Sequence, residues 1–315
     1  MNPDQTATAD STLAYEHIEV SAGDYRFHAL SQGDGPLVLC LHGFPDYPGS
    51  YAGMLAALAN AGYRAVAPYQ RGYHPDTLSA DMRYQTIELA QDALNLIDAL
   101  GYENAVVIGH DWGSSIASGA AVLAPAKVRA LITAAVPYGT KLGEALLIDP
   151  EQQRRSWYMF FFQTELAEMA VSYENMAFIR RLWQDWSPGW DFSETAIQGV
   201  LDTLAQPGVL NAALTYYRCA LNPDYQRPDI AALQARMGET ISVPALYLHG
   251  GKDGCIGAST TEGMANNFSG PFELELLPHV GHFLHLEDPN YVHERILEFL
   301  ATYAPGGHGA PGAPG

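Results

Sequence analysis

The chain has 315 residues, of which 48% are apolar and 16% charged, so it can build a sizeable core and is too apolar for a disordered polymer. Sixteen Lys and Arg against 35 Asp and Glu give a formal charge of −19, which argues against nucleic acid or an anionic membrane as a partner. No apolar run approaches the ~18 residues of a membrane-spanning helix, the N-terminal residues lack a signal-peptide profile, and three scattered cysteines give neither a disulfide framework nor a zinc cage. Composition therefore favours a soluble, cytoplasmic protein.

Strands and helices alternate over the first part of the chain. Apolar runs predict strands at 16–20, 25–30, 36–43, 63–68, 104–110 and 128–136. Helical spacing predicts helices at 50–62, 86–100 and 114–124. This alternation implies crossover connections and a mostly parallel, twisted sheet with helices on both faces.

The alternation stops near Pro137 and resumes with strands at 242–250 and 272–277 and a last helix at 289–303. Between them, 138–240 is rich in aromatic residues at helical spacing. The expected organisation is therefore an α/β core at 15–137 and 241–303, interrupted by a helical cap at 138–240 over the carboxyl edge of the sheet, where ligands bind in such folds. The ends, 1–14 and 304–315, are expected to be disordered.

A strand runs straight into Gly109-His110-Asp111-Trp112-Gly113 and then a helix. This is the setting of a nucleophile elbow, G-x-S-x-G, with Asp111 in place of serine. A helix-capping aspartate is the alternative, but the flanking glycines and the apolar strand before them favour the elbow. A carboxylate that attacks saturated carbon forms an ester, which water can cleave at the carbonyl. Asp111 thus points to displacement on strained epoxides or carbon–halogen bonds.

Hydrolysis of such an ester needs a base, a group that orients it, and an oxyanion hole. His282, in the loop after the last strand, is the candidate base, and Asp253, after the preceding strand, can orient it. The order nucleophile, acid, histidine is that of the α/β-hydrolase arrangement. The backbone N–H groups of Phe44 and Trp112 are the candidate oxyanion donors.

The spacing of His279, His282 and His285 also invites a metal interpretation. A Pro and a Gly interrupt the stretch and no cysteine cluster accompanies it, so no metal is expected. His279 and His285 are predicted to be structural, and His42 and His110 to be hydrogen-bonding scaffold.

These motifs resemble those of the α/β-hydrolase-fold epoxide hydrolases, from about Tyr15 to Tyr303. His42-Gly43-Phe44-Pro45 is similar to that family's oxyanion motif, and 109–113 to its nucleophile motif. The resemblance implies an α/β-hydrolase fold, a cis peptide at Phe44-Pro45, a closing helical cap and no cofactor. It does not by itself separate epoxide hydrolases from haloalkane dehalogenases, which also use Asp followed by Trp.

Two cap tyrosines distinguish these families. In the epoxide hydrolases one Tyr lies four residues before a Phe-Gln pair and a second directly precedes an Arg. Here Tyr158 lies four residues before Phe162-Gln163, and Tyr217 precedes Arg218. The resemblance implies that both phenols hydrogen-bond the epoxide oxygen and protonate it, a role that suits a pKa near ~10. Packing is the alternative for each tyrosine, since the chain has 18 of them.

The sequence departs from the family in the loop after the fourth strand. The usual Asp-x-Arg-Gly-Tyr-Gly reads Tyr69-Gln70-Arg71-Gly72-Tyr73-His74 here, so Tyr69 and His74 replace the Asp and the last Gly. The path of this loop and one wall of the pocket are therefore open.

The combined prediction is an epoxide hydrolase acting on a small apolar epoxide and water. A haloalkane dehalogenase and a non-catalytic protein that binds an apolar ligand stay as alternatives. Aromatic residues of the cap, Trp157, Phe160, Phe161, Trp183 and Trp186, suggest an apolar or aryl substituent. The physiological substrate, the enantiomer preference and the assembly, including a homo-oligomer, stay open.

Overall fold

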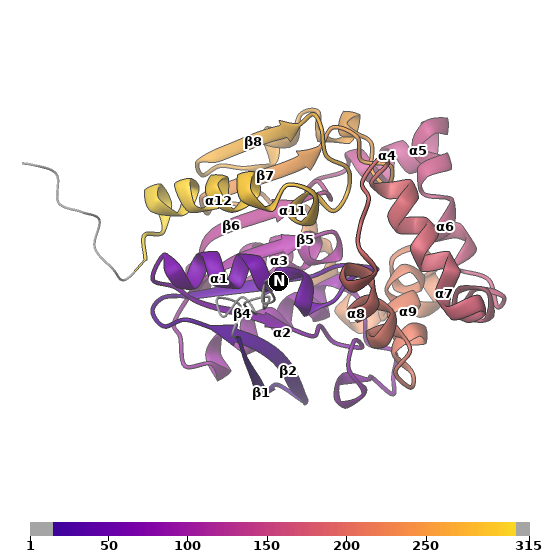
Figure 1. The fold of residues 1–315 in the computed structure, drawn as a ribbon, viewed down its shortest axis with the longest axis horizontal. Coiled ribbons are helices and arrows are strands. Elements are labelled where there is room, and N and C mark those ends of the chain that lie inside the picture. Colours follow the sequence, from indigo (N-terminus) through magenta and orange to yellow (C-terminus); the bar gives the residue numbers. More distant parts are fainter. Residues whose placement is uncertain (1–14, 307–315) are drawn as a thin grey trace, which may run out of the picture.

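A computed structural model describes residues 15–306. They form an eight-stranded sheet in the order β1-β2-β4-β3-β5-β6-β7-β8 (Figure 1). The strands are β1 Glu16–Ala22, β2 Tyr25–Gln32, β3 Leu37–Leu41, β4 Arg64–Pro68, β5 Ala105–His110, β6 Val128–Ala134, β7 Ala245–Gly250 and β8 Phe272–Leu277. β1 pairs antiparallel with β2, and β2 with β4, while β4, β3, β5, β6, β7 and β8 run parallel. The predicted mostly parallel α/β-hydrolase sheet is confirmed.

Helices cover both faces because each central strand is apolar on both sides. In β3, Leu37, Leu39 and Leu41 belong to one buried cluster, and Val38 and Cys40 belong to the other. The first cluster includes apolar side chains of α2 (Thr86–Ala99) and α3 (Trp112–Leu123). The second includes those of α1 (Ala52–Asn60) and α12 (Pro289–Tyr303), which is preceded by the short α11 (Leu284–Glu287). The continuous apolar strands of the sequence are thus explained by burial on two faces.

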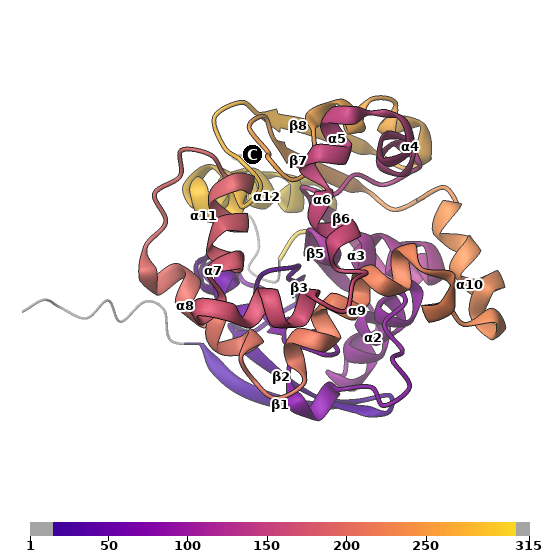
Figure 2. The same cartoon turned by 90° about the vertical axis from the view of Figure 1, so that its right-hand side faces the viewer.

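The segment between β6 and β7 is helical. It contains α4 Lys141–Ile148, α5 Pro150–Arg155, α6 Trp157–Phe161, α7 Ala167–Trp186, α8 Glu194–Leu204, α9 Val209–Leu221 and α10 Ala231–Ala235. α4 to α9 gather at one end of the sheet, on the right in Figure 1, and Figure 2 looks onto them. α7 is interrupted at Glu174, Asn175 and Met176, whose φ angles of 48°, 53° and 57° are left-handed. Sequence spacing did not predict this interruption.

The elements predicted from the sequence are present, with ends that differ by a few residues. Disorder was expected at both ends of the chain. Residues 1–14 and 307–315 lie outside the described residues, whereas 304–306 are described and Ala304 is buried against the sheet. None of the helices in residues 15–306 has the length and hydropathy needed to span a bilayer.

Candidate active site

Asp111 lies on a sharp turn between β5 and α3. Its φ of 54° and ψ of −120° are strained for a residue with a side chain. A Cβ at Gly113 would lie 1.9 Å from the carbonyl oxygen of Leu41, and one at Gly109 would lie 2.1 Å from the carbonyl oxygen of Gly113. Both glycines are therefore required for α3 to start this close to β3 and β5. The turn presents the Asp111 side chain beyond the carboxyl end of β5, as the elbow motif predicted.

The loops after β7 and β8 bring a second carboxylate and an imidazole to Asp111. His282 Nδ1 lies 2.8 Å from Asp253 Oδ2, and His282 Nε2 lies 3.5 Å from Asp111 Oδ2. The other oxygen of Asp253 accepts the backbone N–H groups of Cys255 and Ile256 at 2.7 and 2.8 Å. The Asp253 carboxylate is thus fixed in place, and it fixes the plane of the imidazole.

The two carboxylates control the charge of the imidazole. Burial lowers the pKa of His282, but the attraction of Asp253 and of Asp111 outweighs it and raises this pKa to about 10. Burial raises the pKa of Asp253, but the imidazole outweighs this effect and holds it below its ordinary value. At neutral pH His282 is therefore an imidazolium that lies between the side chains of Asp253 and Asp111.

The loop after β3 places a backbone donor on Asp111. The Phe44 N–H donates to Asp111 Oδ1 at 2.8 Å, and the Phe44–Pro45 peptide is cis, as the resemblance implied. A Cβ at Gly43 would lie 2.4 Å from Asp111 Oδ1, so only glycine permits this approach. The Trp112 N–H, the second candidate donor, makes no hydrogen bond to the Asp111 carboxylate within the described residues.

Tyr158, in α6, and Tyr217, in α9, meet above the carboxylate. Their ring centroids are 5.6 Å apart, and both side chains are buried. Within residues 15–306 the Tyr217 hydroxyl has no hydrogen-bond partner, whereas the Tyr158 hydroxyl lies 3.2 Å from Cys255 Sγ. Burial raises the pKa of both phenols well above the ordinary value for tyrosine, so both are neutral.

A cavity of about 260 Å³ joins these groups. Asp111, Trp112, Tyr158 and Tyr217 form its polar end. The remaining walls are largely apolar and include Val136, Pro137, Leu142, Leu146, Met159, Leu221 and Ile256. The cavity can therefore hold a small apolar molecule with one reactive polar end.

The aromatic residues that suggested an apolar or aryl substituent do not line this cavity, so they give no support to an aryl group. Trp157 and Phe160 are 40% and 48% exposed on the outside of the helical segment, and Trp183 and Trp186 are fully buried in its packing. Aliphatic residues of α4 and the loop before it take the lining position instead. Sequence periodicity could not tell these sets apart because both lie on helices.

The three histidines of the suspected metal pattern point to different surroundings. His282 faces Asp253 and Asp111, whereas His279 is exposed. His285 is buried with Asp46 and His110, its Nε2 3.7 Å from Asp46 Oδ2. Burial lowers the pKa of His110 to about 4, and His110 Nε2 donates to the carbonyl of His282 at 2.9 Å. His110 therefore acts as neutral scaffold beneath the candidate base.

The loop that departs from the family packs away from the cavity. Gln70 donates its backbone N–H to His42 Nε2 at 3.2 Å, and Arg71 forms a buried ion pair with Asp92 at 2.5 Å. His74 stacks on His28, with ring centroids 3.8 Å apart. Tyr69 and His74 are absent from the lining of the cavity beside Asp111, so neither of the two replaced residues forms a wall of it.

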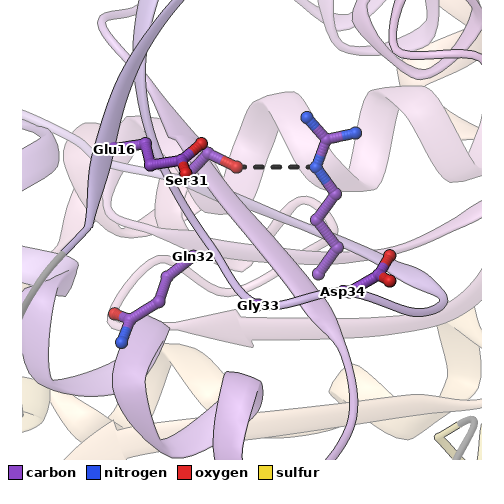
Figure 3. A pocket seen from close by; sticks show the side chains of 6 residues that line it. Glu16, Ser31, Gln32, Gly33 and Asp34 are labelled. Atoms are coloured by element: carbon purple, nitrogen blue, oxygen red, sulfur yellow. Dashed lines mark hydrogen bonds between the residues drawn. The ribbon is translucent and has the colours of Figure 1, made fainter.

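A second cavity, of about 310 Å³, lies beside the end of β2 and the first residues of β1 and β4 (Figure 3). It is lined by Glu16, Ser31, Gln32, Gly33, Asp34 and Arg64, and Arg64 Nε donates to Ser31 Oγ at 3.5 Å. None of the candidate catalytic residues reaches it, and its walls are polar, so the smaller apolar cavity is the candidate active site.

One contact of the site was not predicted from the sequence. Cys255 sits two residues after Asp253, and its thiol contacts the Tyr158 hydroxyl across about a hundred residues of chain. The position next to Asp253 was the available indication, but a buried cysteine there is equally typical of packing.

Comparisons with known proteins agree with this arrangement. A family model described as the α/β hydrolase fold matches residues 36–289. The chain is 30% identical to epoxide hydrolase 3 of Xenopus tropicalis over 302 residues, which cover 93% of this chain and 79% of that protein. It is 30% identical to epoxide hydrolase A of Mycobacterium tuberculosis, over 89% of this chain and 96% of that protein. The crystal structure of an epoxide hydrolase from Vigna radiata superposes with a TM-score of 0.79 at 25% identity, over 92% of this chain and 99% of that one.

Proposed function

This chain belongs to the epoxide hydrolases of the α/β-hydrolase fold, which add water to epoxides to give vicinal diols, and we propose that Asp111 is its covalent nucleophile. It is a hydrolase that acts on ether bonds. The observation that carries the assignment of residues is one cavity lined by a carboxylate and two neutral phenols. A carboxylate supplies the nucleophile, and phenols supply protons to the oxygen that leaves.

The first step opens the epoxide ring. A carboxylate oxygen of Asp111 attacks an epoxide carbon, the carbon–oxygen bond of the ring breaks, and the alkoxide takes a proton from Tyr158 or Tyr217. The products are a hydroxyalkyl ester on Asp111 and a tyrosinate. The unpartnered hydroxyl of Tyr217 supports this role because it is free to donate to a substrate oxygen.

The second step hydrolyses the ester. The His282 imidazolium first gives its proton to the tyrosinate. The neutral imidazole then takes a proton from water, and the water oxygen attacks Cγ of Asp111 to form an oxyanion facing the Phe44 N–H. The bond from Cγ to the alkyl oxygen then breaks, that oxygen takes the proton from His282, and the new acid proton of Asp111 passes to His282, which restores the imidazolium and the carboxylate. The negative charge of Asp111 helps to hold the pKa of His282 at about 10, and esterification removes that charge. The imidazole therefore becomes a base only after the first step.

The lining of the cavity supports an apolar epoxide as substrate. Its volume of about 260 Å³ suits a compact ligand. The walls away from Asp111 and the two phenols carry aliphatic side chains rather than ionic ones. We assign the helical segment 138–240 the role of cap over the core at 15–137 and 241–303, since it supplies both phenols. A cytoplasmic location and a homo-oligomer stay predictions from the sequence.

The test is to stop the reaction between its two steps. His282→Gln should accumulate the ester, because ring opening needs no imidazole but hydrolysis does. Intact-protein mass spectrometry after incubation with styrene oxide should show an adduct of the full mass of the epoxide. His279→Gln, at an exposed histidine, is the matched control and should turn over without an adduct.

The same measurement separates the rival chemistry. A bromoalkane would add only its alkyl group, because bromide departs. An adduct formed only from the bromoalkane would make this chain a dehalogenase with Asp111 as nucleophile. An adduct that persists in the double variant with Asp111→Asn would remove Asp111 from the mechanism.

A further inference from the structure

The last turn of α7 contacts all three loops that carry the catalytic groups. The carbonyl of Trp186 accepts the backbone N–H groups of Gly254 and His282 at 2.9 and 3.1 Å. Ser187 Oγ accepts the N–H of Phe283 at 3.1 Å. Trp183 reaches the remaining loop, where its indole Nε1–H donates to the carbonyl of Pro45 at 2.9 Å. A helix of the segment between β6 and β7 is therefore bonded to the acid, base and oxyanion loops of the core.

Trp183 is held rigidly in this position. Its side chain is fully buried, and its ring lies on Phe283 with centroids 4.5 Å apart. On other sides it packs against Trp190 at 5.5 Å and Phe192 at 5.2 Å. A buried indole N–H requires an acceptor, and here the acceptor is the carbonyl of Pro45, the residue after Phe44.

The oxyanion loop depends on few polar contacts. Towards the core, the carbonyl of His42 accepts the side-chain amide of Gln70. Past Pro45, Asp46 Oδ1 accepts the Tyr47 N–H at 2.8 Å. Between these contacts lie Phe44 and Pro45, whose backbone makes two hydrogen bonds within the described residues: the Phe44 N–H donates to Asp111, and the Pro45 carbonyl accepts from Trp183.

We propose that Trp183 is a positioning residue for the oxyanion hole: by holding the Pro45 carbonyl, it fixes the direction of the Phe44 N–H toward Asp111. The inference rests on the proposed function of Asp111 and Phe44. It makes the cap part of the hydrolytic machinery, and not only a cover that supplies the phenols.

The two half-reactions depend on this N–H to different degrees. In ring opening, the N–H faces a carboxylate whose charge is being lost to the new ester. In hydrolysis, a full negative charge develops on the oxygen that faces it, and preorganised donors act most strongly there. Displacement of the Phe44 N–H should therefore slow hydrolysis of the ester more than its formation.

Three variants separate the hydrogen bond from packing. Trp183→Phe keeps an aromatic ring and removes the N–H. Trp183→His removes more volume but keeps a ring N–H that can reach the same acceptor. Trp190→Phe makes the same chemical change in the neighbouring ring, which stacks on Trp183 and makes no hydrogen bond within the described residues. Thermal unfolding of each variant establishes that it is folded.

Rapid-quench mass spectrometry with styrene oxide measures formation and hydrolysis of the ester separately. For Trp183→Phe we expect ester hydrolysis to fall about tenfold, less than the loss of a whole oxyanion donor, while ester formation changes less than about threefold. Trp183→His should recover most of the hydrolysis rate, and Trp190→Phe should change either rate less than about twofold.

Equal slowing of both steps in Trp183→Phe would overturn the inference, as would a Trp183→His variant no better than Trp183→Phe. So would a Trp183→Phe variant that behaves like Trp190→Phe. Failure of the wild-type protein to form any ester would instead refute the proposed function, so the two failures are distinguishable.

Discussion

Tyr158 and Tyr217 line the same cavity as the Asp111 carboxylate, but the surroundings of their hydroxyl groups differ. The Tyr217 hydroxyl has no partner in the part of the chain that the structure describes, and the Tyr158 hydroxyl contacts a thiol, which is a weak acceptor. Either phenol can therefore donate to an epoxide oxygen. Tyr158→Phe and Tyr217→Phe should each slow ester formation by ~30- to 1000-fold, as loss of one charge-assisted donor does, and the double variant should be far slower than either.

Single-turnover formation of the ester, followed by mass, measures this effect directly. Tyr216→Phe is the matched control because its hydroxyl donates to the carbonyl of Arg71, away from the cavity. That variant should form the ester at the wild-type rate. A double Tyr158/Tyr217 variant that opens epoxides normally would reduce these tyrosines to packing residues.

The charge of His282 should respond to the charge of Asp111. Asp111→Asn keeps the shape of the side chain and removes its negative charge, so the pKa of His282 should fall from about 10. It should stay above that of an isolated buried imidazole, because Asp253 remains at 2.8 Å. An NMR titration of the imidazole nitrogens in both proteins measures the difference. An unchanged pKa would mean that esterification does not switch the base on.

At the residue scale, the sequence predicted what local motifs determine. Asp111, Phe44, Asp253 and His282 each follow a strand end, and the parallel sheet brings such ends together. The two tyrosines came from a resemblance, since helical spacing alone could not separate them from packing residues. The contacts of Trp183 with Pro45 and of Tyr158 with Cys255 join elements about a hundred or more residues apart, and no local pattern encodes them.

Among the elements, two helical glycines have opposite surroundings. A Cβ at Gly199, in α8, would lie 2.1 Å from Cζ of Tyr47, the residue after Asp46 in the oxyanion loop. A Cβ at Gly143, in α4, would meet nothing within 4 Å. Replacing a helical glycine by alanine usually stabilises by roughly 0.5–1 kcal/mol. Gly143→Ala should follow this rule.

Gly199→Ala should instead destabilise by about 1–3 kcal/mol, because the tyrosine ring must leave its place between α8 and the loop. Urea unfolding of both variants measures the sign. In a Tyr47→Ala background, Gly199→Ala should become stabilising, so the double-mutant cycle isolates the contact. If Gly199→Ala stabilises the wild-type background as Gly143→Ala does, this contact does not hold the cap helix to the loop.

Prediction of the elements succeeded where one face or both faces of a segment are buried. The strands and the core helices have this property throughout, as β3 shows by dividing its side chains between two clusters. In the helical segment, spacing predicted helices but neither the left-handed residues of α7 nor which side chains face the cavity. Those features depend on how helices pack on each other, which periodicity does not contain.

For the whole molecule, the buried imidazolium links stability to pH. An unfolded histidine has a pKa of about 6.5, whereas that of His282 in the folded protein is raised to about 10. Below pH 6.5 both states hold the proton, and the stabilisation is fully present. Between these values the unfolded state releases the proton first, so the free energy of unfolding should fall by about 1.4 kcal/mol per pH unit, until the effect is lost near pH 10.

Other charged and ionisable groups also affect the free energy of unfolding over this pH range. The chain already carries a net charge of −19, and it has three buried thiols that resist ionisation. These groups are common to the wild-type protein and to His282→Gln, so the difference between the two proteins isolates the imidazole. Urea unfolding at pH 7, 8 and 9 should give a wild-type stability that falls more steeply than that of His282→Gln. Parallel curves would contradict an imidazolium held between Asp111 and Asp253, and with it the view that the ester, by removing one of these charges, turns His282 into a base.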